Sequence, residues 1–299
     1  MYDVIIIGAG PGGLSAGLYA SRMGLNTLIL EKLSPGGQIV KSSEIENYPG
    51  VCEIKNGMEF MECWPKQATK FGAKIILEEI IKIKKEKEFI VKTNKNTYTS
   101  KAIILATGAT PKKAGFKNED KYIGKGVSYC AVCDGYFYKN MKVAVVGGGD
   151  SALEEALYLS EIAKKVYLIH RRDKFKASPI TIKKILATSN IEVLYNTTIL
   201  EVKGKPFLNK AIIKQNKEIK ELEIDGVFVF VGINVNSNLV KDLCELNEKG
   251  EVKVDLNMKT SIDGLYAIGD VRENSLKQVV IAAGDGATAA LNVVKYIKN

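Results

Sequence analysis

Two segments of this chain carry the same pattern. Residues 4–32 read VIIIGAGPGGLSAGLYASRMGLNTLILEK, and residues 143–171 read VAVVGGGDSALEEALYLSEIAKKVYLIHR. They align without a gap, and the matched positions are Gly8 with Gly147, Gly10 with Gly149, and Gly13 with Ala152. Each copy is an apolar run, a glycine turn, an alanine- and leucine-rich stretch and a second apolar run. This order predicts a strand, a helix and a parallel strand, twice.

The glycines of this pattern have separate physical roles. The first permits a tight turn, the second lets the backbone approach a pyrophosphate, and the third lets helix and strand pack closely. The helix N-terminus then offers unpaired N–H groups and a positive dipole end to phosphates. One such motif is a weak signal, and glycines that serve packing alone are the alternative. Two motifs in register predict two dinucleotide sites, and the residues of their turns include Gly8, Gly10, Pro11, Gly12, Gly13, Gly147, Gly149, Asp150, Ser151 and Ala152.

The two copies differ where the second apolar run ends. The first copy has Glu31, an acidic side chain that accepts hydrogen bonds from ribose hydroxyls and repels a 2′-phosphate. The second copy has His170, followed by Arg171 and Arg172, which are two of only four arginines in the chain. Because the guanidinium fork matches phosphate geometry, this copy favours NADP, with a surface basic cluster as the alternative. His170 is given no catalytic role and is included among the expected phosphate contacts.

Two later segments fit a flavin site, although each alone is an ordinary buried strand with a turn. Residues 101–109 read KAIILATGA, and residues 260–270 read TSIDGLYAIGD. Asp270, at the end of the second segment, can bind a ribityl or ribose hydroxyl. Gln278 follows, and then an alanine- and glycine-rich helix is expected over 279–292.

Composition excludes several classes of protein. With 299 residues, 46% hydrophobic and 26% charged, the chain is expected to be globular and to form two domains. No apolar run approaches the ~18 residues of a spanning helix, and the start of the chain lacks the basic region of a signal peptide. We therefore expect a cytoplasmic protein that does not bind a membrane. The net charge of +9 comes almost entirely from lysine, which favours a solvated surface over a nucleic-acid site.

Five cysteines are present, and two have a spacing with chemical meaning. Cys130 and Cys133 have two residues between them, and Asp134 follows directly as a group able to move protons. A zinc site is the alternative, but four ligands are needed and no second pair of this spacing exists. No metal site is expected. The remaining three cysteines are expected to be small buried hydrophobic residues, namely Cys52, Cys63 and Cys244.

The motifs together resemble one family over essentially the whole chain. They are GAGPGG (8–13), GGQ (36–38), ENYPG (46–50), ATGA (106–109), CAVCDG (130–135), GGGDSA (147–152), HRRDKFK (170–176) and GLYAIGD (264–270). In this order and spacing the chain resembles the bacterial-type, low-molecular-weight thioredoxin reductases. The resemblance implies an α/β fold with two Rossmann-like, three-layer (ββα) dinucleotide-binding domains, the second inserted into the first. It implies an FAD domain over 1–112 and 239–299, and an NADPH domain over 113–238 that carries the dithiol.

The resemblance also assigns cofactor contacts. Those to FAD fall on the 8–13 turn, Glu31, Gly37, Gln38, Asn47, Thr107, Gly108, Gly269, Asp270, Gln278 and Val279. Those to NADPH fall on the 147–152 turn, His170, Arg171, Arg172 and Lys176. Lys176 departs from the arginine usual in the family, which implies a weaker preference for NADPH, because lysine lacks bidentate geometry. Asp150 also departs from the usual asparagine or threonine.

A mechanism and partners follow from the same resemblance. NADPH reduces FAD, the flavin reduces the Cys130–Cys133 disulfide through Cys133, and Cys130 attacks the disulfide of thioredoxin while Asp134 moves protons. The family is homodimeric, and its NADPH domain rotates about two crossovers, here 110–115 and 232–238. Tyr136 and Phe137 are candidates for contacting thioredoxin, or else pack in the core. The alternatives are an FAD-dependent dithiol oxidase, which needs no NADPH site, and a non-catalytic dinucleotide-binding redox sensor.

Overall fold

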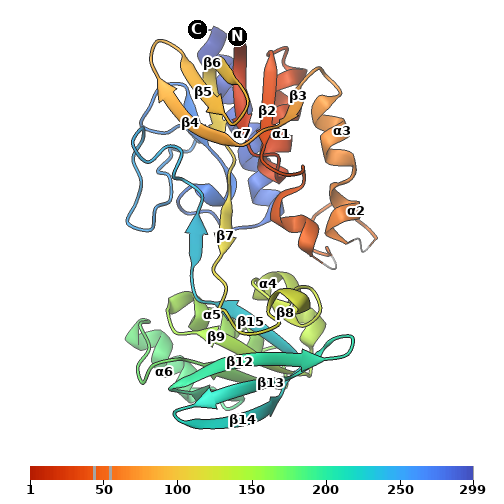
Figure 1. Ribbon diagram of the computed structural model, residues 1–299, viewed down its shortest axis with the longest axis vertical. Coiled ribbons are helices and arrows are strands. Elements are labelled where there is room, and N and C mark those ends of the chain that lie inside the picture. The colour runs from red at the N-terminus through yellow and green to blue at the C-terminus, as the bar shows by residue number, and fades with distance from the viewer. Residues whose placement is uncertain (43–44, 54–55, 299) are drawn as a thin grey trace. The chain divides into compact units, whose positions relative to one another are not determined.

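The computed structural model describes residues 1–42, 45–53 and 56–298, and the chain divides into two compact units (Figure 1). The first unit comprises Met1–Thr110 and the residues from Asn234 onward, and the second comprises Pro111–Ile233. Two short strands, β7 (Ala109–Pro111) and β16 (Ile233–Val235), connect them and pair with each other. The second unit is therefore an insertion in the sequence of the first.

The first unit is built on a seven-stranded sheet of order β3-β2-β1-β6-β5-β4, with β17 also paired to β6. The strands are β1 (Tyr2–Ile7), β2 (Thr27–Glu31), β3 (Lys74–Leu77), β4 (Ile80–Lys85), β5 (Phe89–Thr93), β6 (Thr97–Leu105) and β17 (Leu265–Ala267). Strands β1, β2, β3, β6 and β17 are parallel, whereas β4, β5 and β6 form an antiparallel meander. The long strand β6 thus belongs to both parts of the sheet.

Alternation along the strands gives the first unit its layers. Val4 and Ile6 of β1 lie in one buried cluster, and Ile5 and Ile7 lie in another, because successive strand residues point to opposite faces. The first cluster is covered by helices α1 (Pro11–Arg22), α3 (Cys63–Thr69) and α7 (Val279–Lys298), and the second by the meander. Shorter elements complete the unit, namely η1 (Gly37–Lys41), α2 (Gly57–Met61) and η4 (Gly269–Val271).

The second unit repeats this plan. Its five-stranded parallel sheet has the order β11-β10-β9-β15-β8. The strands are β8 (Val127–Ser128), β9 (Lys142–Gly147), β10 (Lys165–Ile169), β11 (Ile191–Leu194) and β15 (Gly226–Phe230). An antiparallel sheet of β12 (Thr197–Gly204), β13 (Leu208–Gln215) and β14 (Glu218–Glu223) covers one face. The helical elements are η2 (Asp120–Tyr122), α4 (Ala131–Asp134), η3 (Gly135–Tyr138), α5 (Asp150–Ser160) and α6 (Pro179–Ala187).

Both units therefore contain helices, a parallel sheet and an antiparallel layer, which confirms the expected three-layer α/β fold. The two predicted βαβ units are confirmed as β1-α1-β2 and β9-α5-β10, each with parallel strands. In both, the glycine turn follows the carboxyl end of a central strand. This edge is where open parallel sheets bind their ligands.

Candidate functional site

The first glycine turn joins β1 to α1 and contains two kinds of glycine. Gly8 has φ +104°, and a Cβ there would collide with the carbonyl oxygen of Ala106. A Cβ on Gly13 would collide with the carbonyl oxygen of Gly8. Gly10 differs, because the nearest atom to an added Cβ is the Gly37 Cα at 3.8 Å, an ordinary contact. Packing therefore requires Gly8 and Gly13, while Gly10 leaves open space at the N-terminus of α1.

The second glycine turn, between β9 and α5, shows the same division. A Cβ on Gly147 would collide with the Ala152 side chain, and one on Gly148 would collide with the His170 ring. A Cβ on Gly149 would meet nothing within 4 Å. Gly10 and Gly149 each precede the first residue of a helix, so the open space borders unpaired helical N–H groups. Both turns fit the pyrophosphate of a dinucleotide.

Glu31 braces the first turn from the end of β2. Its Oε2 accepts the Ala9 N–H at 2.8 Å, and its Oε1 accepts the Leu33 N–H at 3.0 Å. The side chain is half-buried, and each carboxylate oxygen keeps lone-pair capacity beyond these bonds. Asp150 has a similar role in the second turn, where its Oδ1 accepts the Ser178 N–H at 2.8 Å. Both carboxylates therefore fix the backbone around the open glycine.

His170, one of the expected phosphate contacts, is buried in the second unit. It is 8% exposed, and its ring lies against Gly148. Nδ1 lies 3.0 Å from the Gly147 carbonyl oxygen, and Nε2 lies 2.9 Å from that of Lys174. Since both ring nitrogens face backbone carbonyls, neither is left for a ligand. His170 ties the glycine turn to the loop that follows β10.

That loop presents the basic side chains expected to bind NADPH. Arg171, Arg172 and Lys176 are exposed, and no ion pair joins any of them to an acidic group in residues 1–42, 45–53 and 56–298. The Lys176 N–H donates to the Gly148 carbonyl oxygen at 2.7 Å, so the loop runs beside the second turn. The loop that carries these three cations thus runs beside an open helix N-terminus, which suits an additional phosphate.

The expected flavin contacts come from segments far apart in sequence, and several of these meet around the first turn. An added Cβ on Gly37 would lie 3.0 Å from the Gly10 Cα, which places the 36–38 segment against the turn. The Asn47 Nδ2 donates to the Gln278 Oε1 at 3.1 Å, just before Val279 begins α7. Gln38 is exposed on η1, and Gly108 has open space around it.

Asp270 and Gly269 lie on η4, which is held by a buried ion pair. Arg272 donates from Nε and Nη2 to the two carboxylate oxygens of Asp285 at 2.6 and 3.0 Å, and Asp285 also accepts the Gly269 N–H at 2.9 Å. Burial raises the pKa of Asp270, against the opposing effects of Lys277 and the Ser275 hydroxyl. Asp270 is half-buried, and among the described residues its carboxylate has one weak hydrogen bond, to Ser275 at 3.4 Å, which fits a ligand hydroxyl.

Cys130 and Cys133 form a disulfide, with an S–S distance of 2.08 Å and a Cα–Cα distance of 5.3 Å. The disulfide favours the redox interpretation over the zinc alternative, because zinc binds free thiolates. Cys130 precedes α4, and the Cys133 N–H donates to its Sγ at 3.2 Å. Ala131 of α4 is buried in the same cluster as Ala152 of α5. The disulfide is thereby carried by a helix that packs on the second dinucleotide motif.

Asp134 directly follows Cys133 in the sequence, and burial raises the pKa of its carboxyl. A hydrogen bond from Ser128 acts in the opposite direction. Ser128 Oγ lies 2.5 Å from Asp134 Oδ2. Sequence reasoning missed Ser128, the Arg272–Asp285 pair and Asn236, whose side-chain amide donates to the Thr107 carbonyl oxygen at 2.9 Å. Only Ser128, two residues before Cys130 in a strand that ends there, gave a local signal.

The expectation that all three other cysteines are buried is wrong for two of them. Cys52 and Cys63 are exposed, whereas Cys244 is buried. Burial, followed by the nearby Glu245 charge, raises the pKa of the Cys244 thiol to about 11. Cys244 therefore behaves as the small hydrophobic residue that was expected.

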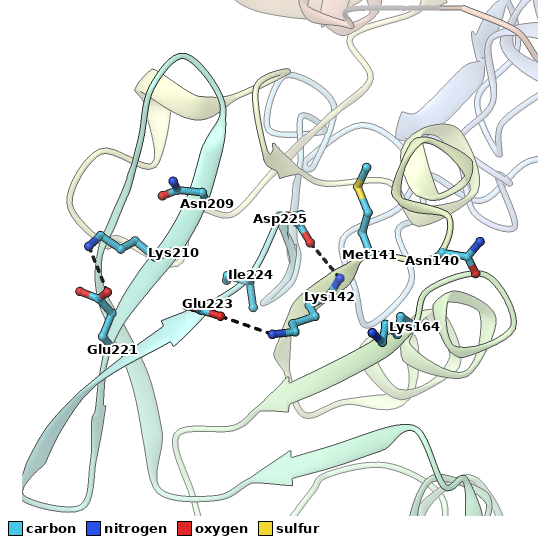
Figure 2. A pocket seen from close by; sticks show the side chains of 10 residues that line it. All are labelled: Asn140, Met141, Lys142, Lys164, Asn209, Lys210, Glu221, Glu223, Ile224 and Asp225. Carbon is cyan, nitrogen blue, oxygen red and sulfur yellow. Dashed lines mark hydrogen bonds and ion pairs between the residues drawn. The ribbon is translucent and has the colours of Figure 1, made fainter.

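One groove of about 550 Å³ lies elsewhere in the second unit (Figure 2). It lies at the start of β9, where the Lys142 N–H donates to Asp225 Oδ2 at 2.9 Å, and is bordered by β13 and β14. Its Lys142 Nζ and Lys210 Nζ pair with Glu223 and Glu221 at 3.5 and 3.0 Å. None of the predicted site residues lines it, and it is at the opposite end of β9 from the glycine turn.

Comparisons with known proteins cover the whole chain. The family model described as pyridine nucleotide-disulphide oxidoreductase matches residues 2–286. A thioredoxin reductase of Helicobacter pylori is 49% identical, and the match covers 100% of both chains. One of Bacillus subtilis is 41% identical over 100% of this chain and 95% of its own. The crystal structure of thioredoxin reductase from Streptococcus pyogenes has a TM-score of 0.96 at 39% identity, and the match covers 100% of this chain and 98% of that one.

The resemblance inferred from the sequence motifs is therefore confirmed. Three findings agree with it. Both glycine turns have an open helix N-terminus, the disulfide lies on the helix that packs on the second motif, and the relatives match over the full length. The chain belongs to the pyridine nucleotide-disulphide oxidoreductase family.

Proposed function

We propose that this chain is an NADPH-dependent thioredoxin-disulfide reductase that uses FAD. The observation that carries the proposal is the Cys130–Cys133 disulfide, which lies in the same unit as a complete glycine turn. Relatives that match over the whole chain are thioredoxin reductases. A dithiol for exchange and a dinucleotide motif in one unit are what disulfide reduction by a nicotinamide cofactor needs.

The assignment of cofactors to units follows from the charges at the two turns. The first unit would hold FAD, with Glu31 toward ribose hydroxyls, the open Gly10 toward the pyrophosphate and the half-buried Asp270 toward a ribityl hydroxyl. The second unit would hold NADPH, with the exposed Arg171 and Arg172 toward the 2′-phosphate. Lys176 supplies charge without a bidentate fork, which predicts a weaker discrimination against NADH.

The chemistry of the dithiol can be written for this chain's own residues. Bound FAD and NADPH supply the two electrons that reduce the Cys130–Cys133 disulfide. The Cys130 thiolate, which the Cys133 N–H faces at 3.2 Å, attacks thioredoxin's disulfide, forms a mixed disulfide and releases one thioredoxin thiol. Cys133 then attacks the Cys130 sulfur, which restores the enzyme's disulfide and releases the second thiol. Two electrons and two protons pass to thioredoxin, with Asp134 giving and regaining protons.

Reaction with both a flavin and a whole protein would require the NADPH unit to rotate about the crossovers. Hydrogen bonds limit where the chain can bend. The N–H groups of Ala114 and Gly115 donate to Glu119 at 3.0 and 2.7 Å, so they move with the second unit. Asn236 exchanges hydrogen bonds with Thr107 at 2.7 and 2.9 Å, so it moves with the first. Bending would therefore be confined to 111–113 and 232–235.

The surface beside the dithiol offers one aromatic side chain to a partner protein. Tyr136 is 62% exposed just beyond the dithiol and is available to thioredoxin, whereas Phe137 is half-buried. A homodimer and a cytoplasmic location would follow the family. Among the described residues, no helix has the length and hydropathy to cross a membrane.

The test is to purify the protein, record its flavin spectrum, and follow NADPH and NADH oxidation with and without oxidised thioredoxin. We expect rapid NADPH oxidation that depends on thioredoxin and that is lost in Cys133→Ser. Bound flavin without oxidation of either nucleotide would contradict the proposal. Oxygen consumption driven by a dithiol would then indicate a dithiol oxidase, and cofactor binding without turnover would indicate a redox sensor.

A further inference from the structure

We propose that Ser128 is a positioning residue that holds the Asp134 carboxyl in place in both of its protonation states. The inference rests on the proposed function, in which Asp134 handles protons for the dithiol. The Ser128 hydroxyl, at the end of β8, contacts the Asp134 carboxyl six residues further along the chain.

The hydroxyl of Ser128 is surrounded by three polar groups. Its Oγ lies 2.5 Å from Asp134 Oδ2, and it accepts the Cys130 N–H at 3.1 Å. The same Oγ lies 3.2 Å from the Cys130 carbonyl oxygen. Ser128 is 5% exposed, so water does not compete freely for these bonds. Strand β8 and helix α4 are thus joined through one side chain, with Cys130 between them.

This arrangement satisfies Asp134 whether it is ionised or neutral. A hydroxyl has one proton and two lone pairs, and the Cys130 N–H uses one lone pair. When Asp134 is ionised, the Ser128 proton points to Oδ2. When Asp134 is protonated, its own proton points to the free lone pair of Ser128, and the Ser128 proton turns to the Cys130 carbonyl oxygen. Only hydrogens move, so the carboxyl keeps its place while its charge changes.

The surroundings make such support necessary. Burial raises the pKa of Asp134, and the Ser128 bond is the one influence that lowers it. On η3, burial first, and then the charges of Asp134 and Asp225, raise the pKa of Tyr138 to about 12. Tyr138 therefore stays neutral across the pH range of an assay. The Asp134 carboxyl is therefore the group beside the dithiol whose titration the Ser128 hydroxyl affects.

Removing the Ser128 hydroxyl should raise the pH at which Asp134 titrates. Ser128→Ala removes the hydrogen-bond partner of both forms of Asp134, but the ionised form loses more, because a hydrogen bond to a charged group is the stronger one. The Asp134 titration should therefore move to higher pH by about one pH unit, the difference between the two bonds. Ser128→Thr keeps the hydroxyl, suits a strand and should restore the original profile. Ser160→Ala is the matched control, because Ser160 lies in the same unit and donates to the Leu157 carbonyl oxygen at 2.6 Å.

The experiment measures the pH dependence of iodoacetamide alkylation of Cys130 and Cys133 in dithiothreitol-reduced holoenzyme, by mass spectrometry. The titration that disappears in Asp134→Asn is assigned to Asp134. The expected result is an upward shift in Ser128→Ala, its reversal in Ser128→Thr and no shift in Ser160→Ala. An unshifted Ser128→Ala profile, an equal shift in Ser160→Ala, or an Asp134→Asn profile identical to the original would each overturn the proposal.

Thioredoxin-dependent NADPH oxidation, measured on the same preparations, separates this inference from the proposed function. If the unaltered enzyme does not reduce thioredoxin but the alkylation shift is present, the proposed function fails and the role of Ser128 stands. If thioredoxin is reduced but the shift is absent, the role of Ser128 fails alone.

Discussion

At the scale of single residues, side chains that hold the backbone differ from side chains left open to a ligand. His170 and Glu31 use their polar atoms on backbone groups of the turns. Arg171, Arg172 and Lys176 are exposed and project from a loop that the backbone already fixes. Sequence position alone placed His170 with the arginines, because its neighbours are charged and its contact with Gly148 is not local.

His170→Ala should therefore destabilise the protein as well as weaken NADPH binding. The change removes the buried ring between the Gly147 and Lys174 carbonyl oxygens, together with the ring N–H that one of them accepts, and we expect it to lower the free energy of unfolding by about 2 kcal/mol. The KM for NADPH should rise about tenfold, by loosening of the basic loop, with kcat changed less. Urea denaturation and steady-state kinetics measure both. Arg171→Ala should raise KM without altering the denaturation midpoint, and the same behaviour in His170→Ala would mean that His170 binds the phosphate directly.

The three thiols outside the disulfide should react at very different rates. Cys52 and Cys63 are exposed, whereas the buried Cys244 has a pKa of about 11 and stays a neutral thiol at pH 8. Ellman's reagent at pH 8 should titrate two thiols rapidly in the oxidised native protein and a third only after unfolding. Cys244→Ser should remove only the third thiol, the one that reacts after unfolding. Three fast thiols in the native protein would contradict the burial of Cys244.

At the scale of elements, the first turn depends on contacts among three segments of the first unit. An added Cβ on Gly8 would collide with the carbonyl oxygen of Ala106, which follows β6. An added Cβ on Gly12 would lie 3.1 Å from the Ala282 carbonyl oxygen on α7. Element η4, which carries Asp270, is held to α7 by the bond from the Gly269 N–H to Asp285. The N-terminus of α1 is thus shaped by segments far along the chain.

Asp285→Asn should destabilise the protein strongly. Arg272 and Asp285 are 13% and 8% exposed, and the substitution leaves a buried guanidinium without its counter-charge. Breaking such a pair costs about 3–5 kcal/mol, and we expect this loss in urea denaturation together with a higher dissociation constant for FAD. Asp263→Asn, which breaks the exposed pair with Lys259, should leave the denaturation midpoint unchanged. Equal effects of the two substitutions would argue against the role of burial.

The elements themselves could largely be predicted, because their signals are local. Apolar alternation and the glycine turns identify β1-α1-β2 and β9-α5-β10 in one pass along the sequence. The bond between Asn47 and Gln278 joins positions 231 apart, and nothing in either segment indicates the other. The same holds for Arg272 and Asp285, because an arginine and an aspartate 13 residues apart become a pair only when η4 packs against α7. Exposure of Cys52 and Cys63 likewise depends on packing.

At the scale of the whole molecule, the chain leaves the first unit after Thr110 and returns to it at Asn234. Each unit has its own pair of buried clusters, one on each face of its parallel sheet. Separate cores make each unit a candidate for independent unfolding. The two connecting strands are the covalent link between them.

Calorimetry should show that the two units unfold separately and that each is stabilised by one cofactor. We expect two transitions in flavin-free protein, with FAD raising the temperature of one and NADP⁺ that of the other. At a ligand concentration of about 100 Kd, the stabilisation should be about 2.7 kcal/mol for the unit that binds. Arg171→Ala should abolish the NADP⁺ effect and leave the FAD effect intact. A single transition raised by both ligands would contradict the assignment of one cofactor to each unit.

The insertion has a consequence for synthesis on the ribosome. Domains generally fold as units while the chain emerges, usually in order from the N-terminus. Here the sequence of the second unit is complete at Ile233, whereas the first unit still lacks β17 and α7. The first unit therefore completes its folding after the second. Strands β1 and β6 are synthesised more than a hundred residues before β17 and α7, which they need for packing. During that interval a nascent chain exposes the edge of β6 and the apolar face of α1, and these are the surfaces that a chaperone would have to cover.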